Sequence, residues 1–95
     1  MIPSEKYVLR LYVTGLTPRS TRAVKTVRSV CEQHLAGHYD LEIIDVYQMP
    51  ARIVEDDVVA IPTLVKYKPA PVRRIIGDMS NRERLLNGLG LSDND

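Results

Sequence analysis

The stretch that decides the fold is YVLRLYVTGLTPRSTRAVKTVRSVCEQHLAGHYDLEIIDVY, residues 7–47. Residues 7–13 are almost continuously apolar and rich in β-forming types, which predicts a strand covered on both faces. Residues 39–47 predict a second strand. The intervening segment is long enough for a helix. A strand, a long helix and a second strand form a βαβ unit, whose two strands lie parallel with a right-handed crossover.

The segment between these strands predicts one amphipathic helix. Thr17 suits the N-cap, and Pro18 suits the first helical position because an N–H there would have no partner within the helix. Gly37 is typical of a helix end. The apolar side chains form a single stripe with helical spacing: Ala23, Val24, Val27, Val30, Cys31 and Leu35. We expect this stripe to face the sheet.

After residue 50 the local preferences are weaker. Residues 50–57 suit a short helix with Ile53 and Val54 turned inward, although the three acids at its end oppose the helix dipole. Residues 58–61 suit a buried strand and a loop equally well. Residues 63–67 are typical of a strand.

The last third predicts a turn, a strand and a helix. Two prolines in residues 68–71 cannot sit within a ladder, so this segment must turn. Residues 72–77 suit an antiparallel partner for the preceding strand. Ser80 and Glu83 match a capping box for a last helix, with Leu85, Leu86 and Leu89 on its apolar side.

The resulting order β-α-β-α-β-β-α is that of a thioredoxin-like α/β domain. Such a domain has a parallel pair and an antiparallel pair of strands, with helices on both faces. Ile61-Pro62-Thr63 stands where that fold places a cis-proline before its third strand. We expect a single domain over 1–95, with flexible ends at 1–6 and 92–95.

Composition limits the function classes. The chain has 95 residues, and no window approaches the ~18 uninterrupted apolar residues of a membrane span. Its start lacks the pattern of a signal peptide, so we expect no membrane association and a cytoplasmic location. Thirteen basic and twelve acidic residues give a net charge of +1, and Phe and Trp are absent. Nucleic acid is therefore not an expected partner.

The sequence gives little support for a catalytic function. A thioredoxin-type enzyme needs a reactive cysteine at the start of the first helix, but residues 15–20 contain none. Thr17 and Ser20 could hydrogen-bond a ligand there. The single cysteine, Cys31, lies in the apolar stripe, which indicates a buried small side chain. A thioredoxin-fold thiol oxidoreductase or transferase remains the alternative function, and it is disfavoured. We expect no catalytic residue and no cofactor.

A metal site is also not expected. Cys31, His34 and His38 have suitable spacing, but they lack a good fourth ligand. Histidines near a helix C-terminus have a simpler explanation in the helix dipole. The acidic run 55–57 is contiguous, so its side chains diverge and suit a solvated segment.

Basic residues are more informative. On the predicted first helix they recur every three residues, and a second group lies on the predicted antiparallel pair: Arg19, Arg22, Lys25 and Arg28, then Lys66, Lys68, Arg73 and Arg74. They form either an ordinary solvated surface or a docking surface for an acidic protein partner. Arg73 and Arg74 should point to opposite faces of a strand, so at least one of them is exposed or paired.

Several stretches resemble the circadian clock protein KaiB family. They are YVLRLYVTG at 7–15, TPRSTRAVK at 17–25, IDV at 44–46, PTLVK at 62–66 and PVRRIIGDMSNRE at 71–83. The resemblance implies a non-enzymatic regulator that binds the hexameric ATPase KaiC. It implies KaiA, or a histidine kinase with a KaiB-like domain, as further partners. It also implies a resting homo-oligomer, a tetramer or dimer, whose C-terminal half has a different fold and switches to the thioredoxin-like one.

The resemblance also marks individual positions. Arg22, Lys66 and Arg74 match basic positions linked to partner binding, and together with Lys25 and Arg73 they are our predicted partner-binding residues. Gly88 and Gly90 mark the predicted fold-switch region. The family commonly has an aspartate at the position of Gly90, and its clock members have a longer acidic tail. These departures suggest a paralogue or a non-cyanobacterial member, which serves either timing or stress adaptation.

Overall fold

A four-stranded sheet with the strand order β2-β1-β3-β4 forms the centre of the molecule. We describe it from a computed structural model, which describes residues 6–15, 17–56, 60–77 and 79–91. The strands are β1 (Tyr7–Val13), β2 (Tyr39–Asp45), β3 (Thr63–Lys68) and β4 (Arg73–Ile76). β1 pairs with β2 in parallel, and the β1–β3 and β3–β4 pairs are antiparallel. This arrangement confirms the predicted thioredoxin-like α/β fold.

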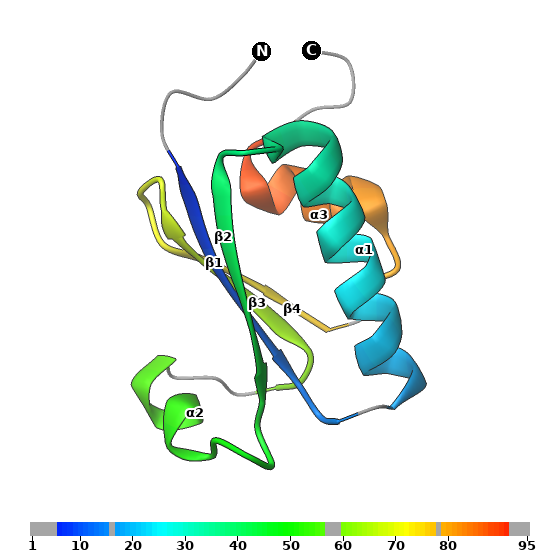
Figure 1. The fold of residues 1–95 in the computed structure, drawn as a ribbon, viewed down its shortest axis with the longest axis vertical. Coiled ribbons are helices and arrows are strands. Elements are labelled where there is room, and N and C mark those ends of the chain that lie inside the picture. Colours follow the sequence, from blue (N-terminus) through cyan, green and yellow to red (C-terminus); the bar gives the residue numbers. More distant parts are fainter. Residues whose placement is uncertain (1–5, 16, 57–59, 78, 92–95) are drawn as a thin grey trace.

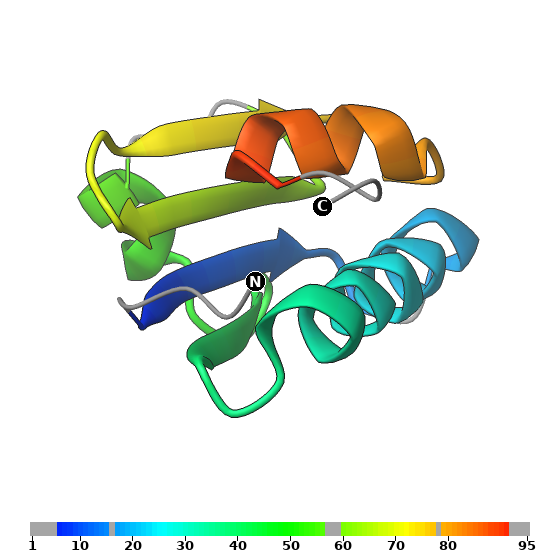
Figure 2. The same ribbon diagram turned by 90° about the horizontal axis from the view of Figure 1, so that it is seen from above.

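Three helices flank the sheet. They are α1 (Pro18–Leu35), α2 (Ala51–Asp56) and α3 (Arg82–Leu89). Figure 1 shows α1 and α3 together on one face, whereas the short α2 lies beyond the other face. Figure 2 shows the sheet and these helices from above. Helices therefore lie on both faces as predicted, but α2 covers only one end of its face.

The helix α1 forms where the sequence predicts it. Thr17 caps it, with its Oγ1 accepting a hydrogen bond from the Ser20 N–H at 3.2 Å. The helix ends at Leu35, and Gly37 follows with a left-handed φ of 77°. Five residues of the apolar stripe are buried, and Val24 is half-buried. The 3.6-residue period therefore identified the core side of this helix correctly.

The core has two parts, because successive side chains of a strand point to opposite faces. Leu9, Leu11 and Val13 of β1 belong to the larger cluster, which lies between the sheet and the helices α1 and α3. Tyr12 belongs to the smaller cluster on the other face. The Tyr12 hydroxyl donates to the Arg52 carbonyl at 3.1 Å, which ties α2 to this cluster. Val8 and Arg10 remain half-buried, so β1 is not fully covered on both faces.

Two local predictions are wrong. Val54 was expected to face inward, but its side chain is 83% exposed. A six-residue helix that touches the sheet through Arg52 leaves Val54 free to face away from the core. The last helix is capped by Asn81 rather than by Ser80, and the Asn81 Oδ1 accepts from the Arg84 N–H at 3.0 Å. The helix thus begins one residue later than the capping-box pattern indicated.

Other boundaries shift slightly. β2 ends at Asp45, where the chain turns, rather than at Tyr47. The Ile61–Pro62 peptide bond is cis, as predicted. Residues 60–62 lead into β3. The predictions for the side chain of Ile53, for residues 57–59 and for the segment 92–95 concern parts of the chain outside the described residues. Lys6, which we expected to belong to a flexible end, forms an ion pair with Asp40 at 3.1 Å. No helix in the described ranges has the length and apolarity to cross a membrane.

Candidate functional site

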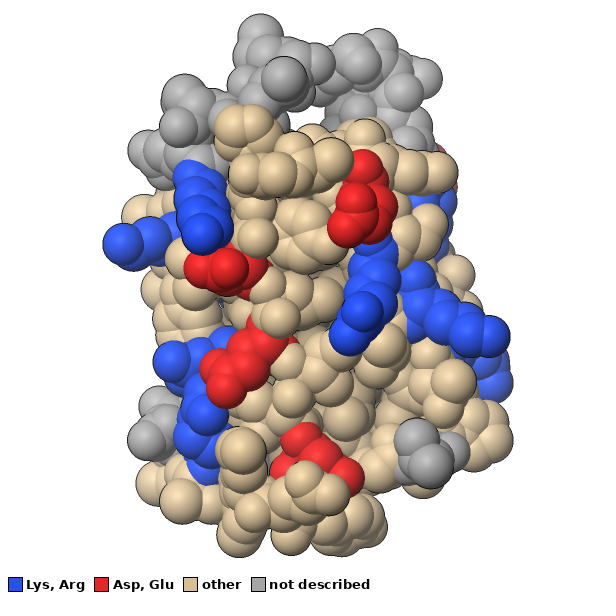
Figure 3. All heavy atoms as spheres, viewed as in Figure 1, with Lys and Arg blue, Asp and Glu red and all other residues tan. Residues whose placement is uncertain are grey.

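The first basic surface lies on α1. Its four basic side chains are all exposed and lie away from the buried stripe: Arg19, Arg22, Lys25 and Arg28. Figure 3 shows blue side chains projecting at the side of the molecule that α1 occupies in Figure 1. The exposure predicted from the three-residue spacing is confirmed. Exposed guanidinium and ammonium groups in this arrangement can contact carboxylates of a protein partner.

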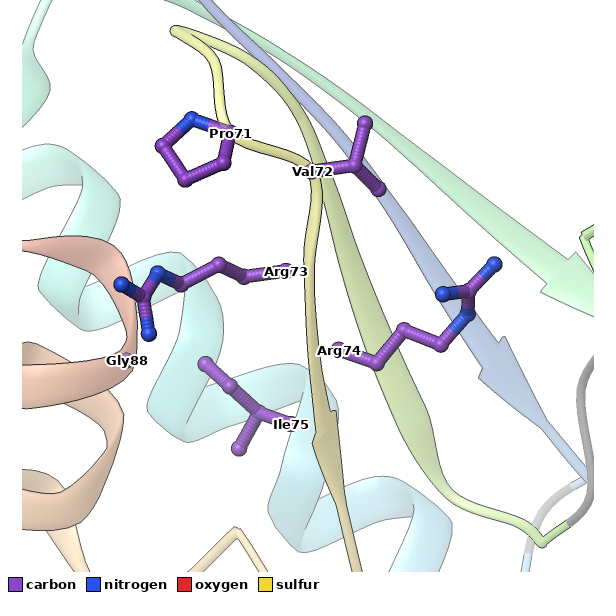
Figure 4. Close-up of a pocket in the computed structure, with 6 residues that line it drawn as sticks. All are labelled: Pro71, Val72, Arg73, Arg74, Ile75 and Gly88. Atoms are coloured by element: carbon purple, nitrogen blue, oxygen red, sulfur yellow. The ribbon is translucent and has the colours of Figure 1, made fainter.

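The second basic surface lies on β4, and it is divided between the two faces of the strand. Arg73 and Arg74 are both exposed. In Figure 4, Arg73 extends toward Gly88 on α3, whereas Arg74 extends to the opposite side of the strand together with Val72. This is the alternation predicted for neighbouring strand residues.

Lys66 does not belong to either surface. Its side chain is only 5% exposed, and its Nζ donates to the Pro69 carbonyl at 2.8 Å. Burial, with a smaller contribution from Arg73, lowers the pKa of the Lys66 ammonium below its ordinary value of 10.5. Lys66 pairs in register with Arg73, so both lie on the helix-covered face of the sheet. Its expected place on an exposed docking surface is therefore wrong for this fold.

The five predicted partner-binding residues consequently do not form one surface. Arg22 and Lys25 lie on α1, Arg73 and Arg74 lie on opposite faces of β4, and Lys66 is interior. A flat partner surface cannot contact all of them together. A single interface can therefore include only some of these residues. Their spacing in the sequence could not show this.

The two glycines of the predicted switch region have different structural roles. Gly90 is the C-cap of α3 with a left-handed φ of 74°, and its N–H donates to the Asn87 carbonyl at 3.2 Å. A residue with a Cβ would be strained there, which explains a glycine at this position. Gly88 lies inside α3 and faces Ile75 of β4. A Cβ at Gly88 would lie 2.5 Å from Ile75 Cδ1, so the glycine permits close packing of α3 on the sheet.

Residues 15–20, where a thioredoxin carries its reactive cysteine, contain no cysteine. Ser20 is buried, and its Oγ accepts from the Thr14 N–H at 3.0 Å, while Thr17 is used as the helix cap. Both hydroxyl oxygens therefore accept hydrogen bonds within the protein. Cys31 is fully buried, and burial, followed by the charge of Glu32, raises the pKa of its thiol to about 12. A thiolate at neutral pH is therefore disfavoured.

The residues considered for a metal site also lie in different environments. Cys31 is in the core, whereas His34 is half-buried with its Nε2 3.4 Å from Arg82 Nη2. Throughout the described ranges, no group of three or more His, Cys, Asp or Glu side chains gathers as metal ligands would.

One charged network was missed by the sequence reasoning. On the sheet face away from α1 and α3, Arg10 and Arg52 both pair with Glu42, at 3.4 Å and 2.8 Å. The hydrogen bonds from Arg52 lower the pKa of the Glu42 carboxyl. Arg10 also lies over the Tyr67 ring, 4.7 Å from its centroid. Arg10 and Glu42 are register partners in the parallel pair, so the βαβ prediction could have identified this ion pair.

Comparison with known proteins decides the family. The family model described as KaiB domain matches residues 10–91. The chain belongs to the KaiB family. Its relatives include the circadian clock oscillator protein KaiB of Synechococcus sp. (strain RCC307), which is 53% identical over 91 residues, covering 96% of this chain and 83% of the relative. The KaiB of Nostoc punctiforme is 53% identical over 92 residues, covering 96% and 88%.

Solved structures agree on the fold of this KaiB family member. The N-terminal domain of Synechococcus elongatus SasA superposes with a TM-score of 0.72 at 23% identity, covering 98% of this chain and 91% of that domain. The Drosophila melanogaster thioredoxin Deadhead gives 0.73 at 16% identity, covering 92% and 81%. At these identities the likeness concerns the fold alone. The fold of the described residues is thus thioredoxin-like, and the relatives are named circadian clock oscillator proteins.

Proposed function

We propose that this chain is a non-enzymatic, protein-binding regulator that binds a KaiC-type hexameric ATPase, in circadian timing or a related stress-adaptation pathway. The single observation that carries the proposal is the match to clock proteins named KaiB, at 53% identity over 96% of the chain. The buried Cys31, with its raised thiol pKa, gives no support to the alternative of a thiol oxidoreductase.

The proposed contact residues are the exposed members of the predicted set. Arg22 and Lys25 present their charges on α1, and Arg73 and Arg74 present theirs on β4. Arginine forks suit carboxylates on the partner, and exposed charges also raise the association rate. KaiA, or a histidine kinase with a KaiB-like domain, would be a further partner. The fold shared with the SasA N-terminal domain supports the idea that a second protein can present a similar shape.

We also propose that binding selects the thioredoxin-like fold from a resting homo-oligomer, a tetramer or dimer, with a different C-terminal half. The physical support is the weak local encoding of that half. α3 has eight residues and carries a glycine in its interior, so it is not stable without tertiary contacts. A partner that binds only one of two competing folds shifts the population toward that fold.

The test is to mix the chain with a KaiC homologue from the same organism, in ATP and in ADP, and to look for a co-eluting complex by size-exclusion chromatography. We expect complex formation with the wild type and at least tenfold weaker binding for Arg22→Glu. Arg28→Glu is the matched control, because it makes the same charge change on the same exposed helix.

Two results would contradict the proposal. A wild-type chain that binds the ring in neither nucleotide rejects the proposed function. Equal weakening by Arg22→Glu and Arg28→Glu rejects the specific role of Arg22 and leaves only a general charge effect.

A further inference from the structure

A pocket lies between the start of α1 and the carboxyl ends of the two parallel strands. β1 ends at Val13 and β2 ends at Asp45, and these two residues are partners in the register of the parallel pair. Both of them line the pocket, whose volume is about 510 Å³. Sites for small molecules have volumes of about 300 to 1,000 Å³. The size of the pocket therefore suits a small ligand.

The topology of the chain also favours a ligand at this place. After β1 the chain enters α1 on one face of the sheet, and after β2 it enters α2 beyond the other face (Figure 1). In open α/β sheets, connections that leave neighbouring parallel strands toward opposite faces create a crevice outside the strand ends, and ligands bind in that crevice. The pocket thus lies where such a sheet provides a binding site.

One wall of the pocket is apolar. It consists of Val13 from β1, Ile43 from β2 and Val24 from α1. Val13 is buried in the larger core cluster, and the half-buried Val24 and Ile43 pack against the same cluster. Because the core supports these three side chains, they form a preformed surface on which the apolar part of a ligand can be removed from water.

A carboxylate lies beside this wall. Asp45 is half-buried, and its Oδ1 accepts from the Tyr47 N–H at 2.9 Å. Among the described residues, its other oxygen, Oδ2, has no hydrogen-bond donor. A Cβ at Gly15 would lie 3.9 Å from this Oδ2, so the glycine leaves the space next to it open. An ammonium group of a ligand can therefore donate to Oδ2.

A positive charge lies on another side of the same pocket. Lys25 of α1 also lines it and is exposed. Among the described residues, Lys25 forms no ion pair with Asp45 or with another carboxylate. Two opposite charges that line one pocket without neutralising each other suit a ligand that carries both charges.

We propose that this pocket binds a small hydrophobic α-amino acid. The ligand's ammonium donates to Asp45 Oδ2, its carboxylate accepts from Lys25 Nζ, and its side chain contacts the wall formed by Val13, Val24 and Ile43. This site goes beyond the proposed function. Its lining residues lie within 13–48, before the C-terminal half that we propose to change fold, and no ATPase takes part. Either proposal can therefore fail without the other.

The test is an NMR titration of the ¹⁵N-labelled chain with L-leucine, in which the amide signals report where the ligand binds. We expect saturable shifts at Gly15, Val24 and Ile43. Two analogues each remove one charge: leucinamide lacks the carboxylate, and 4-methylpentanoate lacks the ammonium. We expect each analogue to bind about tenfold more weakly than leucine, because one charge of the pocket then has no partner.

Two variants test the protein side of these contacts. Asp45→Asn removes the negative charge, while its amide oxygen can still accept from the Tyr47 N–H. Lys25→Gln removes the ammonium from an exposed position. We expect each variant to bind leucine about tenfold more weakly than the wild type. Asp40→Asn on β2 and Arg28→Gln on α1 are the matched controls and should bind like the wild type, because neither residue lines the pocket.

Three results would each overturn the proposal. The first is a wild type that shows no saturable shifts with leucine, and the second is a set of shifts that maps away from the pocket. The third is binding by either analogue, or by Asp45→Asn or Lys25→Gln, as tight as that of leucine to the wild type. The same spectra show whether each variant is folded, and the comparison of analogues on the wild type needs no variant.

Discussion

At the scale of single residues, position in the sheet decided what a charged side chain can do. Lys66 and Arg74 are both basic strand residues, yet Lys66 is buried against the Pro69 carbonyl while Arg74 is exposed. Their difference comes from the alternation of strand faces, because Lys66 points to the helix-covered face and Arg74 to the open one. Residue type alone predicted exposure for both.

Tyr39 allows a pH prediction at this scale. Its hydroxyl donates to Glu32 Oε1 at 2.6 Å, linking β2 to α1. That hydrogen bond, followed by burial and the Glu32 charge, raises the pKa of Tyr39 from 10.0 to about 12. The folded state therefore holds the proton more tightly than the unfolded state. Its stabilising effect is complete below pH 10 and is lost as the pH rises through 12.

The measurement compares the wild type with Tyr39→Phe by urea unfolding between pH 9 and pH 12. We expect the free energy of unfolding of the wild type to fall more steeply with pH above 10 than that of Tyr39→Phe. Tyr47→Phe, at a tyrosine that is 79% exposed, is the control and should follow the wild type. Parallel curves for the wild type and Tyr39→Phe would show that the hydrogen bond does not hold the proton.

At the scale of elements, α3 depends on its neighbours for stability. Asn81 caps its start and Gly90 caps its end, but its last turn carries no basic residue. Arg73 of β4 extends toward that end of the helix instead (Figure 4). A cation near a helix C-terminus stabilises it, so the strand supplies what the helix sequence lacks. The direction of the Arg73 side chain thus suits the end of α3, beside the proposed role of Arg73 in partner binding.

Gly88→Ala tests the contact between α3 and β4. Alanine is favoured over glycine inside a helix by about 1 kcal/mol, but the new Cβ would overlap Ile75. We expect Gly88→Ala to raise the free energy of unfolding more in an Ile75→Ala background than in the wild type, with a coupling of about 1 kcal/mol. Urea unfolding of the four proteins of this double-mutant cycle measures it. Equal effects of Gly88→Ala in both backgrounds would mean that Ile75 moves aside without cost.

At the scale of the whole molecule, Cys31 reports on the integrity of the core. It is fully buried in the cluster between the sheet and α1. Reaction with a thiol reagent therefore requires the core to open. We expect labelling of Cys31 to be negligible in native buffer at pH 8 and to rise with urea in parallel with unfolding followed by circular dichroism.

Ser29→Cys provides the matched control for this measurement. Residue 29 is exposed on the same helix, so its thiol should react quickly in native buffer while Cys31 remains protected. Rapid native labelling of the wild type would show that the core around Cys31 opens readily, and it would also revive the thiol-based function that burial disfavours.

The sequence by itself determined the βαβ unit, because residues 7–47 carry strong local signals in strand composition, helix caps and a 3.6-residue apolar period. It also determined the exposed basic stripe of α1, which is the other side of the same periodic pattern. Tertiary structure alone decided that Lys66 is buried, that Val54 is exposed and that Arg73 and Arg74 belong to different surfaces. These properties depend on which face of an element another element covers, and a short helix or a four-residue strand encodes that only weakly.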